Sequence, residues 1–243
     1  MVPEKKIEEF VRRLREAAGS NLESVVLYGS AANGNYHAEY SDLNFLCILH
    51  DTSYASLQAL APFARWWSKQ RQPAPLLMRS GEMVATNDVF SIELIDMQAH
   101  RRVLFGADPV EGLKVPQRFH RVQVEYELRE KLLLLRQRAL LAEKDDQLWE
   151  LMAGSVPSFA TLFRHALIAL GREASLERRE AINELAQLLR FDPSSILRVL
   201  DVRERKATSK TIAARPLFAA YLAAIEEVTA AMDKMLDPDG SAS

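Results

Sequence analysis

The stretch from residue 24 to residue 49 constrains the fold of this chain more than any other part of the sequence. It contains two apolar runs, Ser24-Val25-Val26-Leu27-Tyr28 and Asn44-Phe45-Leu46-Cys47-Ile48-Leu49. The first run leads into Gly29-Ser30, and Asp42-Leu43 stands directly before the second. The pattern predicts strands over about 24–28 and 43–49, with a Gly-Ser turn after the first strand that opens a short helix.

The remaining sequence predicts an α/β half followed by a helical half. Apolar spacing indicates helices over about 3–17 and 54–69, a short strand over 76–78 and another strand over 89–95. Beyond Pro116 the pattern is helical, over about 117–143, 147–170 with an interruption near 154–157, 175–190, 194–201 and 209–236. We therefore expect an α/β domain over 1–108, an all-α helical bundle over 116–236 and a disordered tail over 237–243.

Composition excludes some classes of function. The net charge of -2 disfavours nucleic acid as the main partner, because domains that bind polyanions are usually basic. No apolar run reaches the length of about 18 residues that a membrane span needs. The single cysteine, Cys47, lies in an apolar run and is interpreted as a core residue in a reducing compartment, so a cytoplasmic protein is expected. The sequence does not indicate an oligomeric state.

Gly29 and Ser30 are candidate ligands for a phosphate group. A strand that ends in this turn presents backbone N–H groups and a hydroxyl to an anion, and Gly29 lets the backbone approach closely. The alternative is a plain strand-turn-helix connection in which Ser30 caps the helix. The Gly-Ser pair alone does not separate these interpretations.

Three further residues are candidate metal ligands. Asp42 and Asn44 are two positions apart, so in a strand their side chains point to the same face. Glu93 lies between Ile92 and Leu94 in the strand predicted over 89–95, where a carboxylate needs a partner such as a metal ion or an arginine. The alternative third acid is Asp96, which is also interpreted as the N-cap of a short helix over 97–103.

Together these residues resemble the nucleotidyltransferase superfamily with the DNA polymerase β-like fold. That family shows Gly-Ser, a gap of about ten residues, Asp-x-Asp and a later acid between apolar residues. The chain is most similar in organisation to small bacterial enzymes that adenylylate aminoglycosides, which join this α/β domain to a C-terminal helical bundle. The resemblance rests on residues 24–105 and implies Mg²⁺ and a nucleoside triphosphate (NTP) as ligands, held by Asp42, Glu93, Gly29 and Ser30.

Asn44 departs from this family pattern. In the family both acids of the Asp-x-Asp pair hold metal, whereas Asn44 offers a neutral amide, and Mg²⁺ prefers charged oxygen ligands. One interpretation is a transferase that moves a nucleoside monophosphate from an NTP to a hydroxyl of a small molecule or protein. In that case the metal site is single or weak, and Asp42 and Glu93 are the catalytic residues. The other is a catalytically degenerate protein that binds a nucleotide or a protein partner. A polynucleotide-extending enzyme is disfavoured by the charge.

Overall fold

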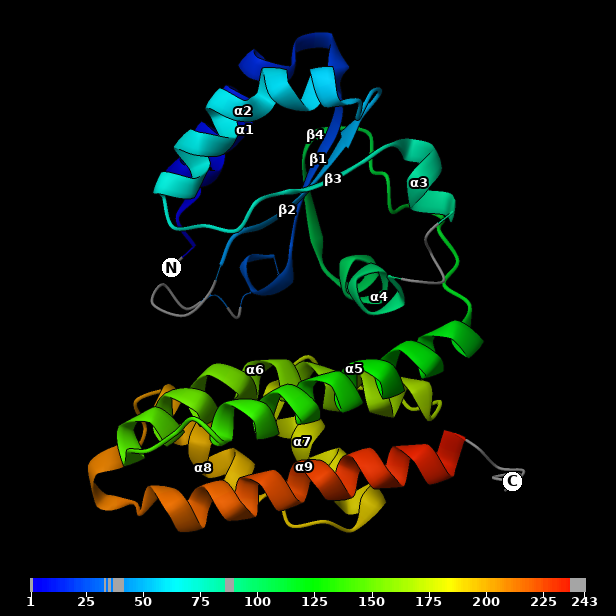
Figure 1. Cartoon of the computed structure of the whole chain (residues 1–243). Helices are drawn as coiled ribbons and strands as arrows, with labels where there is room; N and C mark the ends of the chain where they lie inside the picture. Colours follow the sequence, from blue (N-terminus) through cyan, green and yellow to red (C-terminus); the bar gives the residue numbers. More distant parts are fainter. Residues whose placement is uncertain (1, 33, 35, 37–41, 86–89, 237–243) are drawn as a thin grey trace. The chain divides into compact units, whose positions relative to one another are not determined.

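The computed structural model describes residues 2–32, 34, 36, 42–85 and 90–236. The chain divides into two units, residues 1–116 and 117–243, and each unit is described by itself (Figure 1). The first unit contains a mixed sheet with helices and the second is built of helices, as the sequence predicted. The disordered tail predicted over 237–243 lies outside the described residues.

The first unit is organised around a four-stranded sheet with the strand order β3-β2-β1-β4. β1 (Leu22–Tyr28) is antiparallel to both β2 (Asn44–Leu49) and β4 (Arg101–Gly106), whereas β3 (Leu76–Met78) is parallel to β2. The register pairs Tyr28 with Asn44 on one side and with Arg101 on the other. The C-terminal end of β1 therefore lies beside the starts of β2 and β4.

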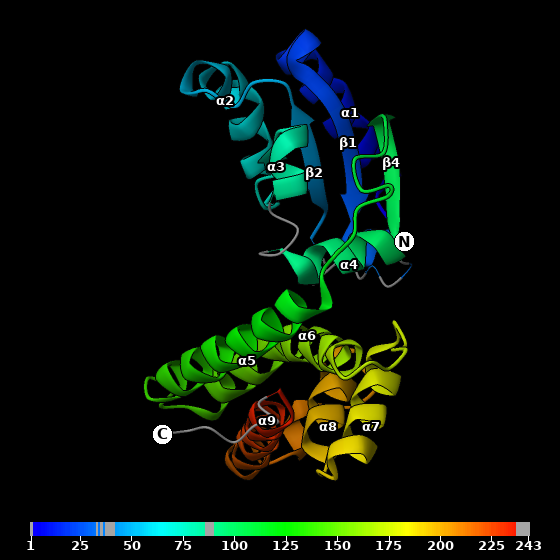
Figure 2. The same cartoon turned by 90° about the vertical axis from the view of Figure 1, so that its right-hand side faces the viewer.

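Two helices cover one face of this sheet. α1 (Glu4–Ala18) and α2 (Tyr54–Lys69) lie side by side over it (Figure 1, Figure 2). The ring of Phe10 in α1 stacks on Phe45 in β2 with a centroid distance of 3.7 Å, and both contact the edge or face of Trp67 in α2. This aromatic cluster anchors the core because burial of large apolar side chains dominates folding energetics.

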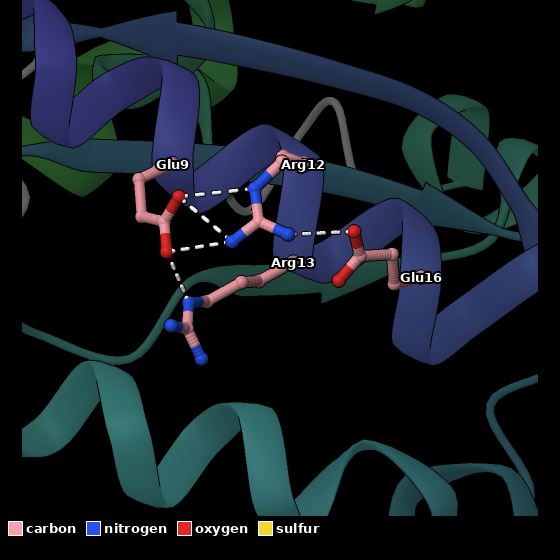
Figure 3. Close-up of polar contacts among 4 residues, drawn as sticks. All are labelled: Glu9, Arg12, Arg13 and Glu16. Atoms are coloured by element: carbon pink, nitrogen blue, oxygen red, sulfur yellow. Dashed lines mark hydrogen bonds and ion pairs between the residues drawn. The ribbon is translucent and has the colours of Figure 1, made fainter.

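The outer surface of α1 carries a row of ion pairs. Glu9 accepts hydrogen bonds from Arg12 and Arg13, and Arg12 also reaches Glu16 with a distance of 2.6 Å between Nη1 and Oε1 (Figure 3). The guanidinium of Arg13 lies 4.5 Å from the ring centre of Trp66 in α2. The exposed ion pairs add little stability, so the helix is held mainly by its buried face.

Two short helices cover the opposite face of the sheet. α3 (Ser80–Ala85) and α4 (Ser91–Ala99) pack there through Met83, Leu94 and Met97, which contact Val26, Leu46 and Ile48 of the central strands. Val110 joins the same cluster and is 1 % exposed. The chain therefore remains packed on the first unit after β4 ends.

The structure corrects two sequence predictions in this region. The strand predicted over 89–95 is wrong, because α4 begins at Ser91, and the helix predicted over 97–103 with Asp96 as N-cap is wrong, because Asp96 lies inside α4 and β4 begins at Arg101. Three alternating apolar residues, Phe90, Ile92 and Leu94, suggested the strand. A short helix buried against a sheet also places apolar residues at such positions, so this pattern does not separate the two structures.

The second unit is a bundle of helices. They are α5 (Gln117–Ala139), α6 (Asp145–Ala169), α7 (Arg178–Leu189), α8 (Ser194–Arg203) and α9 (Ala214–Leu236), with a 3₁₀ turn, η3, at Ser209–Thr211. α6 lies at the centre and packs against the other four. The interruption predicted near 154–157 is wrong, since α6 continues through Pro157 and keeps Val156 and Phe159 buried on either side of it.

Candidate functional site

The turn after β1 is a single turn of 3₁₀ helix, η2 (Gly29–Ala31). Gly29 has φ +74°, a left-handed conformation that favours glycine. Ala31 is buried in the core under α1 and α2, so it fixes the turn to the sheet while Ser30 stays half-buried. The sequence predicted a turn at this position followed by a short helix. Among the described residues, that helix consists of the single 3₁₀ turn η2.

The side chain of Asn44 lies directly against the turn. A Cβ atom added to Gly29 would be 3.0 Å from Nδ2 of Asn44 and 3.9 Å from its Cγ. The pairing of Asn44 with Tyr28 across the strands produces this proximity, because Gly29 follows Tyr28 immediately. The structure thus brings two of the predicted site residues, Gly29 and Asn44, into contact range.

Asp42 lies outside the strand. β2 begins at Asn44, so Asp42 precedes the strand and its side chain is exposed. The segment between them is fixed by Leu43, which is 1 % exposed and donates its backbone N–H to Oε1 of Gln72 at 2.8 Å. Burial, and then the charge of Asp42, raise the pKa of Tyr36, so this ring lies near the carboxylate.

Glu93 lies in the first turn of α4 rather than in a strand. Its Oε2 atom is buried and has no hydrogen-bond partner among the residues that the structure describes. Burial, followed by the negative charge of Glu93, raises the pKa of Tyr28 to about 12. Glu93 is therefore near Tyr28, at the end of the sheet where Asn44 and Gly29 meet.

Tyr28 and Arg101 are two residues at this end that the sequence analysis missed. Arg101 pairs with Tyr28 across the strands, and its guanidinium donates to the carbonyl oxygens of Met97 and Gln98 at 3.2 and 3.0 Å. Its Nε also donates to Oδ2 of Asp108 at 2.7 Å. Arg101 thus holds the C-terminal end of the helix that carries Glu93 through hydrogen bonds that the sequence does not indicate.

The potential metal ligands predicted for this site are the carboxylates of Asp42 and Glu93 and the amide of Asn44. Within residues 2–32, 34, 36, 42–85 and 90–236, no three His, Cys, Asp or Glu side chains gather closely enough to hold a metal ion. Asp42 offers an exposed carboxylate, which suits an ion that arrives with the phosphates of a ligand. Asn44 turns its amide nitrogen, which cannot coordinate a cation, toward Gly29.

The chain is similar to a known domain family and to a solved structure. Residues 4–98 match the family model described as "Nucleotidyltransferase domain", a range that includes every site residue predicted from the sequence. The solved structure of spectinomycin adenyltransferase AAD(9) from Enterococcus faecialis, with ATP and spectinomycin, is similar with a TM-score of 0.63 and 16% sequence identity. The similarity covers 95% of this chain and 99% of that chain, and at this identity it shows the fold. No curated protein matches the sequence significantly.

No helix among the described residues is both long enough and apolar enough to cross a membrane.

Proposed function

We propose, from the match of residues 4–98 to the nucleotidyltransferase domain model, that the chain transfers a nucleoside monophosphate from an NTP to a hydroxyl group of a small molecule or protein. The observation that carries the proposal is the contact between Gly29 and Asn44 at the end of β1, with Tyr28 and Glu93 beside them. This arrangement places the glycine turn and the start of the second strand around one point.

The proposed reaction is an in-line displacement at the α-phosphorus. The acceptor hydroxyl oxygen forms a bond to the α-phosphorus, the bond from that phosphorus to the bridging oxygen breaks, and pyrophosphate leaves. A divalent ion bound with the nucleotide supplies positive charge that stabilises the triphosphate. The acceptor hydroxyl loses its proton in the same reaction.

Each site residue has a proposed role. Gly29, which has no side chain, leaves room for the phosphates, and Ser30 donates a hydrogen bond to a phosphate oxygen. Asp42 would hold the ion, and Glu93 would accept the proton of the acceptor hydroxyl. Arg101 positions Glu93 through its hydrogen bonds to the end of α4.

The acceptor is proposed to be a small polar molecule rather than a nucleic acid. The net charge of -2 gives no electrostatic support for a polyanion. The similar solved structure contains ATP together with spectinomycin, a pairing that supports a nucleotide and a small acceptor here. A protein acceptor remains within the proposal because the transferred group requires only an accessible hydroxyl.

Asn44 favours a second candidate function, a protein that binds a nucleotide without transferring it. A neutral residue stands where the family has a metal-binding acid, and the described residues lack a cluster of three potential metal ligands. Weaker metal binding would slow the displacement while leaving the phosphate contacts of the turn in place. Nucleotide binding is common to both candidates, and pyrophosphate release separates them.

Pyrophosphate release tests the proposal. Purified protein is incubated with each NTP, Mg²⁺ and a panel of hydroxyl-bearing acceptors, together with the Asp42→Asn variant and the control Asp146→Asn, an exposed residue of α6. The proposal expects acceptor-dependent release that Asp42→Asn abolishes and Asp146→Asn leaves unchanged. Nucleotide binding without release, and release appearing only in Asn44→Asp, would instead support the second candidate.

A further inference from the structure

The side-chain amide of Asn44 lies against the glycine turn at Gly29. Its Nδ2 is 3.0 Å from the position that a Cβ of Gly29 would occupy, its Cγ is 3.9 Å away, and its carbonyl oxygen is farther still. The donating end of the amide therefore faces the backbone at the glycine turn. Asn44 is held in this place because it pairs with Tyr28 at the start of β2.

The donating end of an amide and a carboxylate act oppositely on a phosphate. The NH₂ group offers two hydrogen-bond donors, whereas an ionised carboxylate only accepts. A carboxylate beside a triphosphate repels it unless a cation lies between them, while an amide NH₂ contacts a phosphate oxygen directly. An amide beside the glycine turn can therefore contact an anion through its NH₂ group, which a carboxylate cannot do without a cation.

We propose that Asn44 donates a hydrogen bond to a phosphate of the bound nucleotide and does not ligate metal, so that the site takes an NTP with one divalent ion. This inference rests on the proposed function, which places the phosphates at the Gly29 turn. The single ion is held from the side of Asp42, whose exposed carboxylate precedes β2. Asn44 occupies the place where a second ion would otherwise bind.

The proposal has a consequence that does not involve transfer activity. Part of the affinity for the triphosphate comes from a neutral donor, so nucleotide binding persists when metal is removed. Replacing Asn44 with alanine removes the donor. Replacing it with aspartate removes the donor and adds a negative charge, which makes nucleotide binding depend on metal.

The test measures metal stoichiometry and metal-free affinity. The probes are Mn²⁺, counted by equilibrium dialysis, and α,β-methylene-ATP, which cannot transfer its nucleotidyl group. Calorimetry in EDTA gives the affinity of wild type, Asn44→Ala and Asn44→Asp. The control Asn183→Asp adds the same charge at an exposed position in α7, and circular dichroism verifies that each variant is folded.

We expect one Mn²⁺ per bound nucleotide in wild type and a second in Asn44→Asp. In EDTA, Asn44→Ala should bind the analogue about tenfold more weakly than wild type, as loss of a hydrogen bond to a charged group implies. Asn44→Asp should bind still more weakly, and Asn183→Asp should match wild type.

Two results would overturn the inference while leaving the proposed function standing. One is two Mn²⁺ ions per nucleotide in wild type with one lost in Asn44→Ala, which would make the carbonyl oxygen a metal ligand. The other is equal metal-free affinity in wild type and Asn44→Ala. A wild-type protein that binds no nucleotide with or without metal would instead overturn the proposed function and this inference together.

Discussion

Replacing Gly106 with alanine should destabilise the first unit far more than the same change at Gly112. Both glycines have φ +74°, so both substitutions incur the left-handed backbone cost of about 1–2 kcal/mol. A Cβ at Gly112 meets nothing within 4 Å, whereas a Cβ at Gly106 would be 2.0 Å from the backbone oxygen of Glu23. The clash must be relieved by moving strand backbone, since no flexible side chain is involved.

The extra cost at Gly106 follows from what surrounds it. Gly106 pairs with Ser24, whose hydroxyl donates to the carbonyl oxygen of Ala107 at 2.6 Å. Separating β4 from β1 here would weaken this bond and the neighbouring backbone hydrogen bonds between the two strands. Each of these hydrogen bonds contributes about 0.5–1.5 kcal/mol. We expect Gly106→Ala to cost about 3–5 kcal/mol in free energy of unfolding and Gly112→Ala about 1–2 kcal/mol.

Urea denaturation followed by tryptophan fluorescence measures this difference. The sequence has three tryptophans, Trp66 and Trp67 in α2 and Trp149 in α6. A Trp149→Phe background restricts the signal to the first unit, which makes a two-state analysis of that unit appropriate. Equal destabilisation by Gly106→Ala and Gly112→Ala would refute the close approach of Gly106 to β1.

Three further predictions concern the site and the two cores. Gly29→Ala crowds the amide of Asn44, so calorimetry in EDTA should show ATP binding about tenfold weaker than in Gly112→Ala, and equal affinities would contradict this contact. Burial and the charge of a neighbouring histidine lower the pKa of His120 to about 4 from 6.5, so the folded state binds fewer protons and the helical unit should lose up to about 3 kcal/mol as pH falls from 6.5 to 4. Urea titrations across that pH range measure the loss. In His120→Asn the free energy of unfolding should depend less on pH, and an unchanged pH dependence would contradict the assignment to His120. Phe10→Ala should cost the first unit about 3–5 kcal/mol because the ring is fully buried, and a thermal shift near zero would contradict this packing.

The parts of the fold that the sequence predicted are those with long or strongly periodic apolar patterns. The buried runs at Val25–Leu27 and Phe45–Leu49 became the central strands, and the helix predicted over 54–69 became α2, which covers one face of the sheet. β3 was also predicted at its observed position. In these segments the type of element that the local pattern indicates agrees with the tertiary packing.

The sequence mispredicted the segment around Glu93 because its apolar pattern is short. The segment from Ser91 to Met97 is short, and both a strand and a helix can bury its apolar residues. β4 was not predicted because its buried and exposed residues do not alternate regularly. It is an edge strand, and its register with β1 shifts between Val25 and Val26. Tertiary contacts, which the sequence does not display, decide both cases.

The candidate site was predicted in its parts but not in its geometry. Gly29 and Asn44 were singled out by type and spacing, yet their contact depends on the pairing of Tyr28 with Asn44. The proximity of Glu93 to Tyr28 depends on how α4 packs under the sheet. Neither relation can be obtained from spacing along the chain.

Calorimetric titration of the intact chain with ATP and GTP, with and without Mg²⁺, tests the central claim of a nucleotide site at the end of β1. The account predicts saturable binding of at least one nucleotide, strengthened by Mg²⁺ in wild type. Asp42→Ala should remove the Mg²⁺ dependence, whereas the control Asp146→Ala should retain it. Absence of binding to either nucleotide in both conditions, or identical Mg²⁺-dependent binding in wild type and Asp42→Ala, would contradict it.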